Sequence, residues 1–311
     1  MLNRSLIDNI NQLYSLGIIS ADLLRESSDN HVWLLSSSDG RKYVARISKR
    51  NIGDDISFEI DWINFFFANG VPVAPIIKTS QGRFYANLSD GSPVVIFVYV
   101  AGSQIKIDFS TPPPLQAVLS AATALAKLHN ASQNYKTTFT RPRTVFSELE
   151  RVSIHREDFQ KNISGGQRLF DQIEQNLNWA KSYSYDTVLV HNDFRVDNII
   201  FSNNEVAAII DFDWCCLGPA IKDVAHALAE WSFPDGASAH WGKPFKEFLN
   251  SYNQAALKKI PLDNDLYHWI AFSCLSDAAT YLVDRLEKGE TKPPDSSYMY
   301  AKFNYFFKKL F

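Results

Sequence analysis

The chain has 311 residues, 46% hydrophobic and 14% aromatic, which supports a packed core and excludes an intrinsically disordered chain. Its 31 Lys and Arg residues against 34 Asp and Glu give a formal net charge of −3 without a basic block, so we expect no nucleic-acid partner. The apolar run PVVIFVYVAG is about half the ~20 residues that cross a bilayer, and the N-terminal MLNRSLIDNI lacks the apolar core of a signal peptide. We therefore expect a cytoplasmic protein with no membrane partner.

The first predicted elements are extended. Residues 31–47 predict a β-hairpin, with the strands HVWLLSS and KYVARIS around the turn SDG. A helix is predicted next, in DDISFEIDWINFFFANG, because apolar residues recur at helical spacing and the segment stops at Gly70, shortly before Pro72. Its expected apolar face consists of Ile56, Ile60, Ile63 and Phe67. Two strand-like runs, RFYANL and PVVIFVYV, follow.

Helices are predicted to dominate from there onward. The run DFSTPPP introduces one whose apolar face consists of Leu115, Val118, Leu119, Ala122, Leu125 and Ala126. The segments PFKEFLNSYNQAAL and LYHWIAFSCLSDAATYLVDRL are amphipathic, and residues 164–167 and 233–236 are predicted loops. We expect a small β-rich N-terminal part, residues 1–98, and a larger helical part, residues 99–311, which begins with a connector at 99–102.

The cysteines agree with a reducing compartment. Cys215 and Cys216 are adjacent and Cys274 is left over, and no CxxC or Cys/His spacing indicates a metal site or a disulfide framework. We expect these thiols to be buried or idle.

Polar residues are concentrated in the stretch HNDFRVDNII. His191, Asp193 and Asn198 lie between strand-like TVLV and NIIFS, on a loop, where catalytic groups are often found. Asp211 comes thirteen residues after Asn198, at the end of the apolar strand VAAII. Asn198 and Asp211 offer oxygen ligands for Mg²⁺, and an uncommitted Asp193 beside them meets a further need of phosphoryl transfer, which is to orient an attacking hydroxyl.

Neighbouring polar residues leave alternatives open. We count His191 among the candidate catalytic residues, in an orienting role rather than a proton-transferring one. Asp213 would lie on the same side as Asp211 if the strand continued, and would then be a second metal contact. Arg195 and Asp197 either pair with each other on the loop surface or contact substrate or phosphate.

The pattern H-x-D-x4-N followed by I-D-F-D resembles the catalytic and metal-binding loops of the aminoglycoside phosphotransferase and choline kinase family. The resemblance covers residues 45–230. It implies an α+β, bilobal, protein-kinase-like fold. A small N-terminal lobe of antiparallel sheet plus helix would bind nucleotide, and a larger, mainly helical C-terminal lobe would hold catalysis and substrate.

The resemblance extends on both sides of the polar stretch. Upstream, Arg46 in YVARI stands in the place of the phosphate-contacting lysine and Glu59 in that of its helix-borne partner. Downstream, GPAIKDVAHAL is similar to the segment that follows the metal aspartate, where Asp223 would brace the catalytic loop. The alternative for Asp223 is a helix N-terminal acid that stabilises the macrodipole.

Glu59 has support from the residues themselves. It falls on the apolar face of its predicted helix, and a buried carboxylate without a cation costs several kcal/mol or more. Arg46 is the expected partner and Lys42 the fallback. Two features depart from the family pattern. The first is the arginine itself, although its planar guanidinium can hold both a carboxylate and a phosphate oxygen. The second is the loop SSDNH at 27–31, which contains no glycine.

The resemblance implies an ATP- and Mg²⁺-dependent kinase that phosphorylates a hydroxyl of an aminoglycoside-, choline- or homoserine-like small molecule. Asp193 would orient and deprotonate the hydroxyl, and Asn198 and Asp211 would hold Mg²⁺ on the phosphates. Arg46, directed by Glu59, would fix the phosphates. The backbone expected to bind adenine is that of Phe97, Tyr99 and Val100.

A late helix offers a candidate acceptor site. Asp277, Tyr281 and Asp284 recur at i, i+4 and i+7, so they share one helix face. The stripe is either solvated or the wall of a site for an amino-bearing substrate, in which cation–π contacts would come from Trp231, Trp241 and Trp269.

Two other functions stay open. A protein kinase shares the Asp-x4-Asn spacing, but DFD replaces DFG and no Ala-Pro-Glu motif follows at the required distance. A catalytically inactive nucleotide-binding scaffold is suggested by Arg46 and the glycine-free loop. The presence of Asp193, Asn198 and Asp211 together argues against it.

Overall fold

The structure is a computed structural model that describes residues 2–26, 30–49, 53–106, 111–137, 139, 141–233 and 240–310. Residues 27–29 of the glycine-free loop and 234–236 of the predicted loop at 233–236 therefore lie outside the described residues. The chain divides into two compact units. Unit 1 comprises residues 1–102, 137–140 and 207–210, and unit 2 comprises residues 103–136, 141–206 and 211–311. The functional division into lobes at 1–98 and 99–311 stays a prediction.

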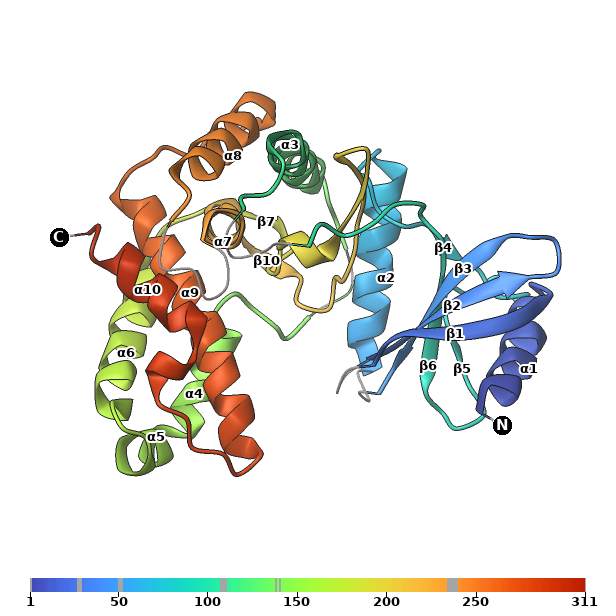
Figure 1. Cartoon of the computed structure of the whole chain (residues 1–311), viewed down its shortest axis with the longest axis horizontal. Helices are drawn as coiled ribbons and strands as arrows, with labels where there is room; N and C mark the ends of the chain where they lie inside the picture. The colour runs from blue at the N-terminus through green and yellow to red at the C-terminus, as the bar shows by residue number, and fades with distance from the viewer. Residues whose placement is uncertain are drawn as a thin grey trace. The chain divides into compact units, whose positions relative to one another are not determined.

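Unit 1 is built on an antiparallel sheet with the strand order β1-β2-β3-β6-β4, in which β5 also pairs with β6 (Figure 1). The strands are β1 (Ile18–Glu26), β2 (Asn30–Ser37), β3 (Lys42–Ser48), β4 (Ile76–Ile77), β5 (Ala86–Asn87) and β6 (Pro93–Val98). The predicted hairpin is confirmed, since β2 and β3 pair from Asn30 opposite Ser48 to Ser36 opposite Lys42. The strand predicted in RFYANL is shorter than expected, because β5 covers Ala86–Asn87 alone.

Each face of this sheet is covered by a helix, α1 (Leu2–Tyr14) on one side and α2 (Gly53–Ala68) on the other (Figure 1). Successive strand residues point to opposite faces, and β6 shows the consequence. Val94 lies in the apolar cluster that α1 joins, whereas Val95 packs against Ile60 of α2. Both faces of β6 are therefore buried, which explains why its sequence is a continuous apolar run rather than an alternating one.

The apolar face of α2 differs from the predicted one at its end. Phe67 is 54% exposed, whereas Phe66 is 1% exposed. Adjacent helix residues point about 100° apart, so only one of the two rings enters the core. Helix α1 and strand β1 were not among the predicted elements.

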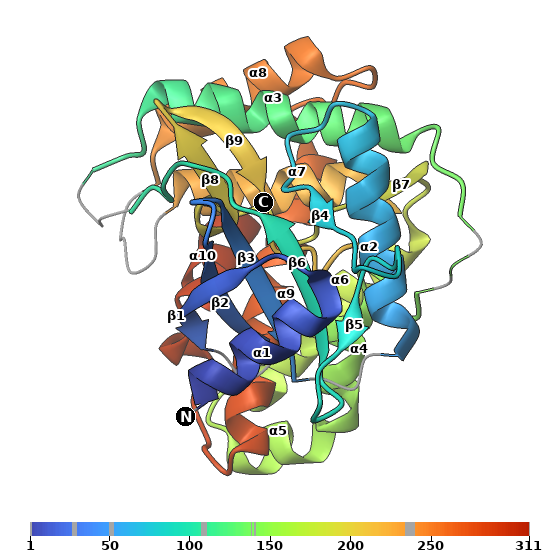
Figure 2. The ribbon, with the colours of Figure 1, turned by 90° about the vertical axis from the view of Figure 1, so that its right-hand side faces the viewer.

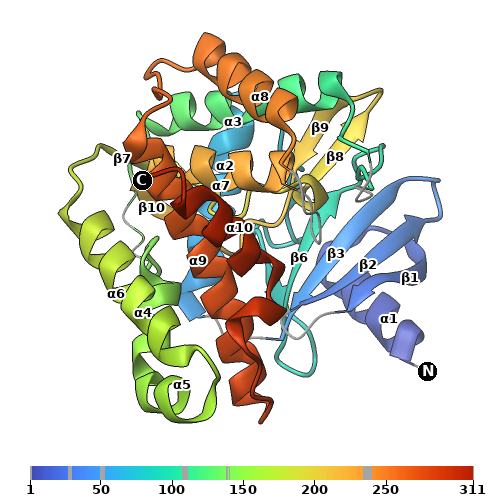
Figure 3. The same ribbon diagram turned by 60° about the vertical axis from the view of Figure 1, so that its left-hand side comes forward.

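Unit 2 is mainly helical (Figure 3). Its helices are α3 (Leu115–Ser132), α4 (Ser147–Ile154), α5 (Arg156–Asn162), α6 (Gly166–Ser182), α7 (Ala220–Ser232), α8 (Gly242–Ala255), α9 (Asn264–Glu287) and α10 (Tyr298–Phe307). The loop predicted at 164–167 is wrong in its second half, because α6 begins at Gly166. A Cβ at Gly166 would lie 1.8 Å from the carbonyl oxygen of Phe159, so this glycine permits α5 and α6 to pack closely.

Two short strand pairs frame the polar stretch. Strand β7 (Thr187–Val190) pairs with β10 (Cys216–Pro219). Strand β8 (Ile199–Ser202) pairs with β9 (Glu205–Ile209), and Figure 2 shows β8 and β9 side by side. The cysteines are free and buried, as predicted. Within the described ranges, no helix combines the length and the apolar character that a membrane span needs.

Candidate active site

The loop between β7 and β8, residues 191–198, is curled by its own backbone. The N–H of Arg195 donates to the carbonyl of Asp193 at 2.9 Å, and the N–H of Asn198 donates to that of Arg195 at 3.0 Å. Asn192 has a φ of 65°, a left-handed conformation that Asn adopts more readily than most residues. The curl brings residues five apart in the sequence, Asp193 and Asn198, next to each other.

Asp193 and Asn198 form the centre of the candidate site. The Asn198 side-chain N–H donates to Oδ2 of Asp193 at 2.8 Å and to the Asp193 carbonyl at 2.9 Å. Burial raises the pKa of the Asp193 carboxyl to about 7, although the charges of His226 and Arg195 oppose the shift. The Asp193 side chain is still 26% exposed, so a solute can reach it. A carboxyl with a pKa near neutrality is suited to general base catalysis.

Asp211 follows β9 in a turn. Its φ is 66°, and β9 ends at Ile209, so the strand does not continue as the prediction for Asp213 required. The charge of Asp211 is close enough to contribute to the raised pKa of Asp193. The backbone after Asp211 is fixed by Arg141, which donates to the carbonyl of Asp213 at 2.6 Å and to that of Cys215 at 2.7 Å. Sequence reasoning missed Arg141, since no motif connects it with this turn.

Asp223 in α7 holds the start of the 191–198 loop. Its carboxylate accepts hydrogen bonds from the backbone N–H groups of His191 at 2.7 Å and Asn192 at 2.8 Å. The His129 ring lies 3.1 Å from the same carboxylate. Burial alone would raise the pKa of Asp223, but the hydrogen bond and charge of His129 and the charges of His191 and Lys222 lower it to about 2. An ionised Asp223 is therefore part of the fold.

Two further buried groups support the loop. The His191 ring is 0% exposed and packs against Phe212 with centroids 4.9 Å apart and against Phe194 at 5.8 Å. Such a ring is placed to hold the loop rather than to meet a solute. Lys222, which is 2% exposed, donates to the side-chain oxygen of Asn192.

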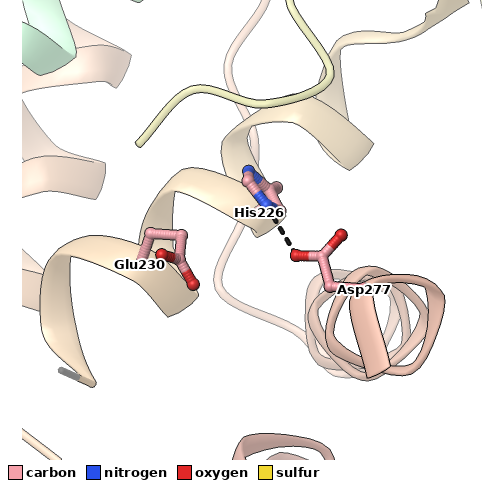
Figure 4. A group of neighbouring side chains, drawn as sticks. All are labelled: His226, Glu230 and Asp277. Atoms are coloured by element: carbon pink, nitrogen blue, oxygen red, sulfur yellow. Dashed lines mark hydrogen bonds and ion pairs between the residues drawn. The ribbon is translucent and has the colours of Figure 1, made fainter. Parts of the chain in front are cut away.

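A second polar group lies beside Asp193 and comes from α7 and α9 (Figure 4). The His226 Nε2 lies 2.9 Å from Oδ2 of Asp277 and 4.0 Å from Oδ1 of Asp193. Glu230, one turn after His226, accepts a hydrogen bond at 2.7 Å from the buried Lys302 of α10. Asp277 is the one member of this group that belonged to the predicted stripe of Asp277, Tyr281 and Asp284.

Arg195 and Asp197 form the pair predicted as one of their two alternatives. The guanidinium lies 3.0 Å from the Asp197 carboxylate. Burial would lower the pKa of Arg195, but the carboxylates of Glu230, Asp193 and Asp197 raise it on balance. Arg195 is thus a permanent cation on the loop.

In unit 1, Arg46 and Glu59 form a two-pronged ion pair. The two guanidinium nitrogens donate to the two carboxylate oxygens, each at 2.6 Å. The side chains are only 9% and 3% exposed. Strand β3 supplies Arg46 and α2 supplies Glu59, so the pair also links the sheet to the helix. The guanidinium lies 6.0 Å from the centroid of the Phe97 ring.

The backbone predicted to bind adenine is partly engaged within unit 1. Phe97 pairs with Val44 in the sheet, and the N–H of Val98 donates to Pro75 at 2.9 Å. The N–H of Tyr99 donates to Lys42 at 3.3 Å. These backbone groups already form hydrogen bonds within the sheet or at its edge. Of the three residues predicted to bind adenine, Val100 therefore stays the candidate.

The predicted aromatic contribution to the acceptor site is wrong for two of its three residues. Trp231 and Trp269 are each 0% exposed and belong to the helical core, where large apolar rings gain most from burial. Trp241 directly precedes α8 and is partly exposed.

Asp284 lies in the same helix as Asp277, α9, and its carboxylate pairs with Arg151 of α4 at 2.6 Å. This carboxylate therefore joins two helices.

Comparisons with known proteins give one consistent class. The model of the phosphotransferase enzyme family matches residues 21–259. Homoserine kinase of Bartonella tribocorum is 26% identical over 290 residues, covering 91% of this chain and 86% of that protein. Among solved structures, amicoumacin kinase hAmiN in complex with AMP-PNP, Ca²⁺ and Ami has a TM-score of 0.72 at 15% identity, covering 99% of this chain and 92% of that one. The microcompartment-associated aminopropanol kinase has a TM-score of 0.64 at 17% identity, with coverage of 92% and 98%.

Proposed function

Since the chain belongs to the phosphotransferase enzyme family, we propose that it transfers the γ-phosphate of ATP to the hydroxyl of a small amino-bearing alcohol, with a homoserine-like amino acid as first candidate. The membership confirms the family predicted from the H-x-D-x4-N pattern, and the structural likeness confirms the α+β, protein-kinase-like fold. The protein is a small-molecule phosphotransferase with a hydroxyl acceptor. The nucleotide, the metal, the acceptor and the residue roles belong to the proposal.

The observation that carries the proposal is the 2.8 Å hydrogen bond from Asn198 to Oδ2 of Asp193. It leaves Oδ1 of Asp193 for the acceptor hydroxyl and the side-chain oxygen of Asn198 for a cation. In the proposed reaction the acceptor oxygen forms a bond to the γ-phosphorus, and the bond from this phosphorus to the bridging oxygen of ADP breaks. Asp193 takes the hydroxyl proton, and its pKa of about 7 allows it to release that proton again near neutral pH.

The oxygen ligands fit a divalent cation. Asn198 and Asp211 would hold Mg²⁺ through side-chain oxygens, the ligand type that this ion prefers. When bound, the ion would neutralise charge on the nucleotide phosphates. The complex of amicoumacin kinase with AMP-PNP and Ca²⁺ supports a nucleotide and a divalent ion. A second metal contact at Asp213 stays a prediction, although the strand that it assumed ends at Ile209.

In unit 1, Arg46 would contact the nucleotide phosphates while Glu59 fixes its guanidinium. An arginine suits this place because its planar guanidinium, which binds Glu59 with two N–H groups, has the geometry to hold both a carboxylate and a phosphate oxygen. Asp223 and His191 would keep the 191–198 loop in its shape.

Two observations support an amino-bearing acceptor. Asp193 and Asp277 both carry partly exposed carboxylates, at 26% and 36%, near Nε2 of His226. Negative charge near the acceptor favours a cationic group on it. The named relatives include kinases of homoserine and of aminopropanol, which both contain an amino group and a hydroxyl.

The test is acceptor-dependent release of ADP. Purified protein with ATP and Mg²⁺ is given homoserine, aminopropanol, choline and an aminoglycoside in parallel. We expect turnover with one of them and a fall in kcat of at least ~100-fold in Asp193→Asn, the size typical for loss of a general base. Asp284→Asn, on the stripe but paired with Arg151, is the matched control and should retain activity.

Arg46 in the place of a lysine favours one second candidate, a nucleotide-binding protein without transferase activity. Measurable ATP binding by calorimetry, combined with no turnover on any acceptor or protein substrate, would support it and exclude the kinase. The expectations of a cytoplasmic location and of no nucleic-acid partner stay predictions.

A further inference from the structure

Helix α7 faces the 191–198 loop at two successive turns. Asp223 accepts hydrogen bonds from the backbone at the start of the loop. His226 follows three residues later, on the same helix face, with Nε2 4.0 Å from Oδ1 of Asp193. A single rigid helix therefore contacts both the loop backbone and the carboxylate that the proposed function uses.

The two oxygens of the Asp193 carboxylate differ in their surroundings. Oδ2 is held by Asn198 at 2.8 Å. Among the described residues, no group donates a hydrogen bond to Oδ1, and His226 is the nearest imidazole to it. A separation of 4.0 Å is too long for a hydrogen bond, yet contacts of this kind commonly shorten when substrate binds. Because the one proton on Nε2 also faces Asp277, His226 would then share it between the two carboxylates as a bifurcated donor.

His226 is itself held in one orientation. Its side chain is 1% exposed, and Nε2 lies 2.9 Å from the Asp277 carboxylate. A carboxylate partner fixes both the ring orientation and the nitrogen that carries the proton. Burial lowers the pKa of His226, but Asp277 and Glu230 raise it on balance, against the opposing charge of Lys222. The ring is therefore suited to carry positive charge beside Asp193.

The imidazole of His226 and the carboxylates of Glu230 and Asp277 lie close enough together to suggest a metal site (Figure 4). The surrounding charges argue against that interpretation. The ammonium group of Lys302 already lies 2.7 Å from Glu230, and both side chains are buried. The dashed line in Figure 4 marks the contact of His226 with Asp277, so Nε2 is engaged as well. A divalent cation would have to displace a buried lysine from its partner.

We propose that His226, held by Asp277, is a positioning residue that keeps Oδ1 of Asp193 directed at the acceptor hydroxyl. The inference rests on the proposed function and adds a residue pair to it. His226 acts through Asp193, and Asp277 acts through His226. Neither motif spacing nor the family pattern singles out His226.

The first experiment separates positioning from packing. His226→Leu should lower kcat by about 100-fold and leave the KM for ATP unchanged, because the base loses its orientation but the nucleotide contacts remain. His226→Gln, whose terminal N–H reaches the place of Nε2, should restore at least a tenth of the wild-type kcat. His268→Leu, which removes a histidine of α9 that stacks on Trp179 of α6, is the control and should keep wild-type kcat. Equal kcat in the Leu and Gln variants, with both folded by circular dichroism, would overturn the proposal.

The second experiment asks whether Asp277 acts through His226. Asp277→Asn should lower kcat, and adding it to His226→Leu should cause no further loss, because both changes remove one coupled interaction. A rise in the KM for the acceptor with kcat unchanged would mean that Asp277 contacts the acceptor directly. That result would also overturn the proposed chain of contacts.

Wild-type turnover distinguishes the two levels of failure. If the wild type phosphorylates an acceptor and the folded His226→Leu variant is equally fast, the positioning role is wrong and the kinase assignment stands. If the wild type releases no ADP with any acceptor, both fall together.

Discussion

The ion pair of unit 1 and the 191–198 loop of unit 2 are both buried polar sites, but they are built differently. Arg46 and Glu59 bind each other with two hydrogen bonds between regular elements, β3 and α2. The shape of the loop does not depend on a single buried ion pair of this kind. Its backbone is held by Asp223, and Asp223 is held in turn by His129 of α3. A pair can be removed as a unit, whereas a network loses several contacts when any member changes.

The largest effect is expected from Asp223→Ala. The change leaves two backbone N–H groups and the His129 ring without their acceptor in a site that is 0% exposed. We expect a loss of about 4 kcal/mol in the free energy of unfolding, together with a fall in kcat of about 1000-fold. Urea unfolding and the ADP-release assay measure the two quantities.

Asp223→Asn tests the same network with less damage, since the amide retains one acceptor oxygen for the loop backbone. Its losses should lie between those of Asp223→Ala and the wild type. Asp171→Ala, on α6 where the carboxylate accepts from the exposed Gln167, is the matched control and should change neither quantity. Wild-type kcat in the folded Asp223→Ala variant would show that the loop keeps its shape without the brace.

The next effect is expected in unit 1, where a second substitution should offset most of the damage that the first one causes. Glu59→Leu removes two hydrogen bonds from the Arg46 guanidinium in a site where it is 9% exposed, and should cost about 3 kcal/mol in the free energy of unfolding. Adding Arg46→Met should restore most of that stability, because both members of the buried pair are then gone. Chemical denaturation of both variants measures this, and a double variant no more stable than Glu59→Leu would contradict the view that the two charges depend chiefly on each other.

The difference between the two sites also explains what the sequence could predict. The hairpin periodicity places Arg46 on a strand, and the helical periodicity of the next segment turns Glu59 inward. Both groups then lie within fourteen consecutive positions, 46–59, so a burial argument suffices to pair them. The contact of Asp193 with Asn198 is predictable for the same reason, because the loop between them is short.

The rest of the network could not be derived, because its members come from distant segments. His129 lies in α3 and Arg141 in the segment before α4, and each reaches its partner only through the packing of unit 2. His226 is spaced as an ordinary helix residue, so no periodicity marks it. The strand continuation assumed for Asp213 is wrong for a local reason, since the positive φ of Asp211 ends the extended backbone, whereas the metal contact itself stays a prediction.

Two histidines of unit 2 sharpen the contrast between a polar network and an apolar setting. Burial lowers the pKa of His240 to about 4, and its ring packs against Phe245 and Tyr305. A group with a lowered pKa stabilises the fold above its unfolded value of 6.5, so stability should fall as the pH drops from 6.5 toward 4. The pKa of His226 is raised, so its contribution is complete below 6.5 and is lost as the pH rises through its folded pKa.

The measurement is the free energy of unfolding against pH for the wild type, His240→Phe and His226→Gln. In the His240 variant, the fall in the free energy of unfolding between pH 6.5 and 4 should be smaller by about 1 kcal/mol, an amount that allows for the partial exposure of His240. The His226 variant should flatten the alkaline side instead. If both variants flatten the same side, the assignment of opposite signs is wrong.

The smallest effect is expected from an ion pair on the surface. Lys161 and Glu157 in α5 lie 2.8 Å apart, close to the length of the Arg46–Glu59 contacts, but their side chains are 70% and 82% exposed. Water solvates both charges almost equally well in the unfolded chain, so Glu157→Gln should change the free energy of unfolding by less than ~0.5 kcal/mol. Urea unfolding in low and high salt checks this, because salt should remove the small remainder while leaving the cost of Glu59→Leu nearly unchanged. A cost for Glu157→Gln comparable with that of Glu59→Leu would mean that ion pairing itself, rather than the stranding of a buried partner, sets the energy of such contacts in this protein.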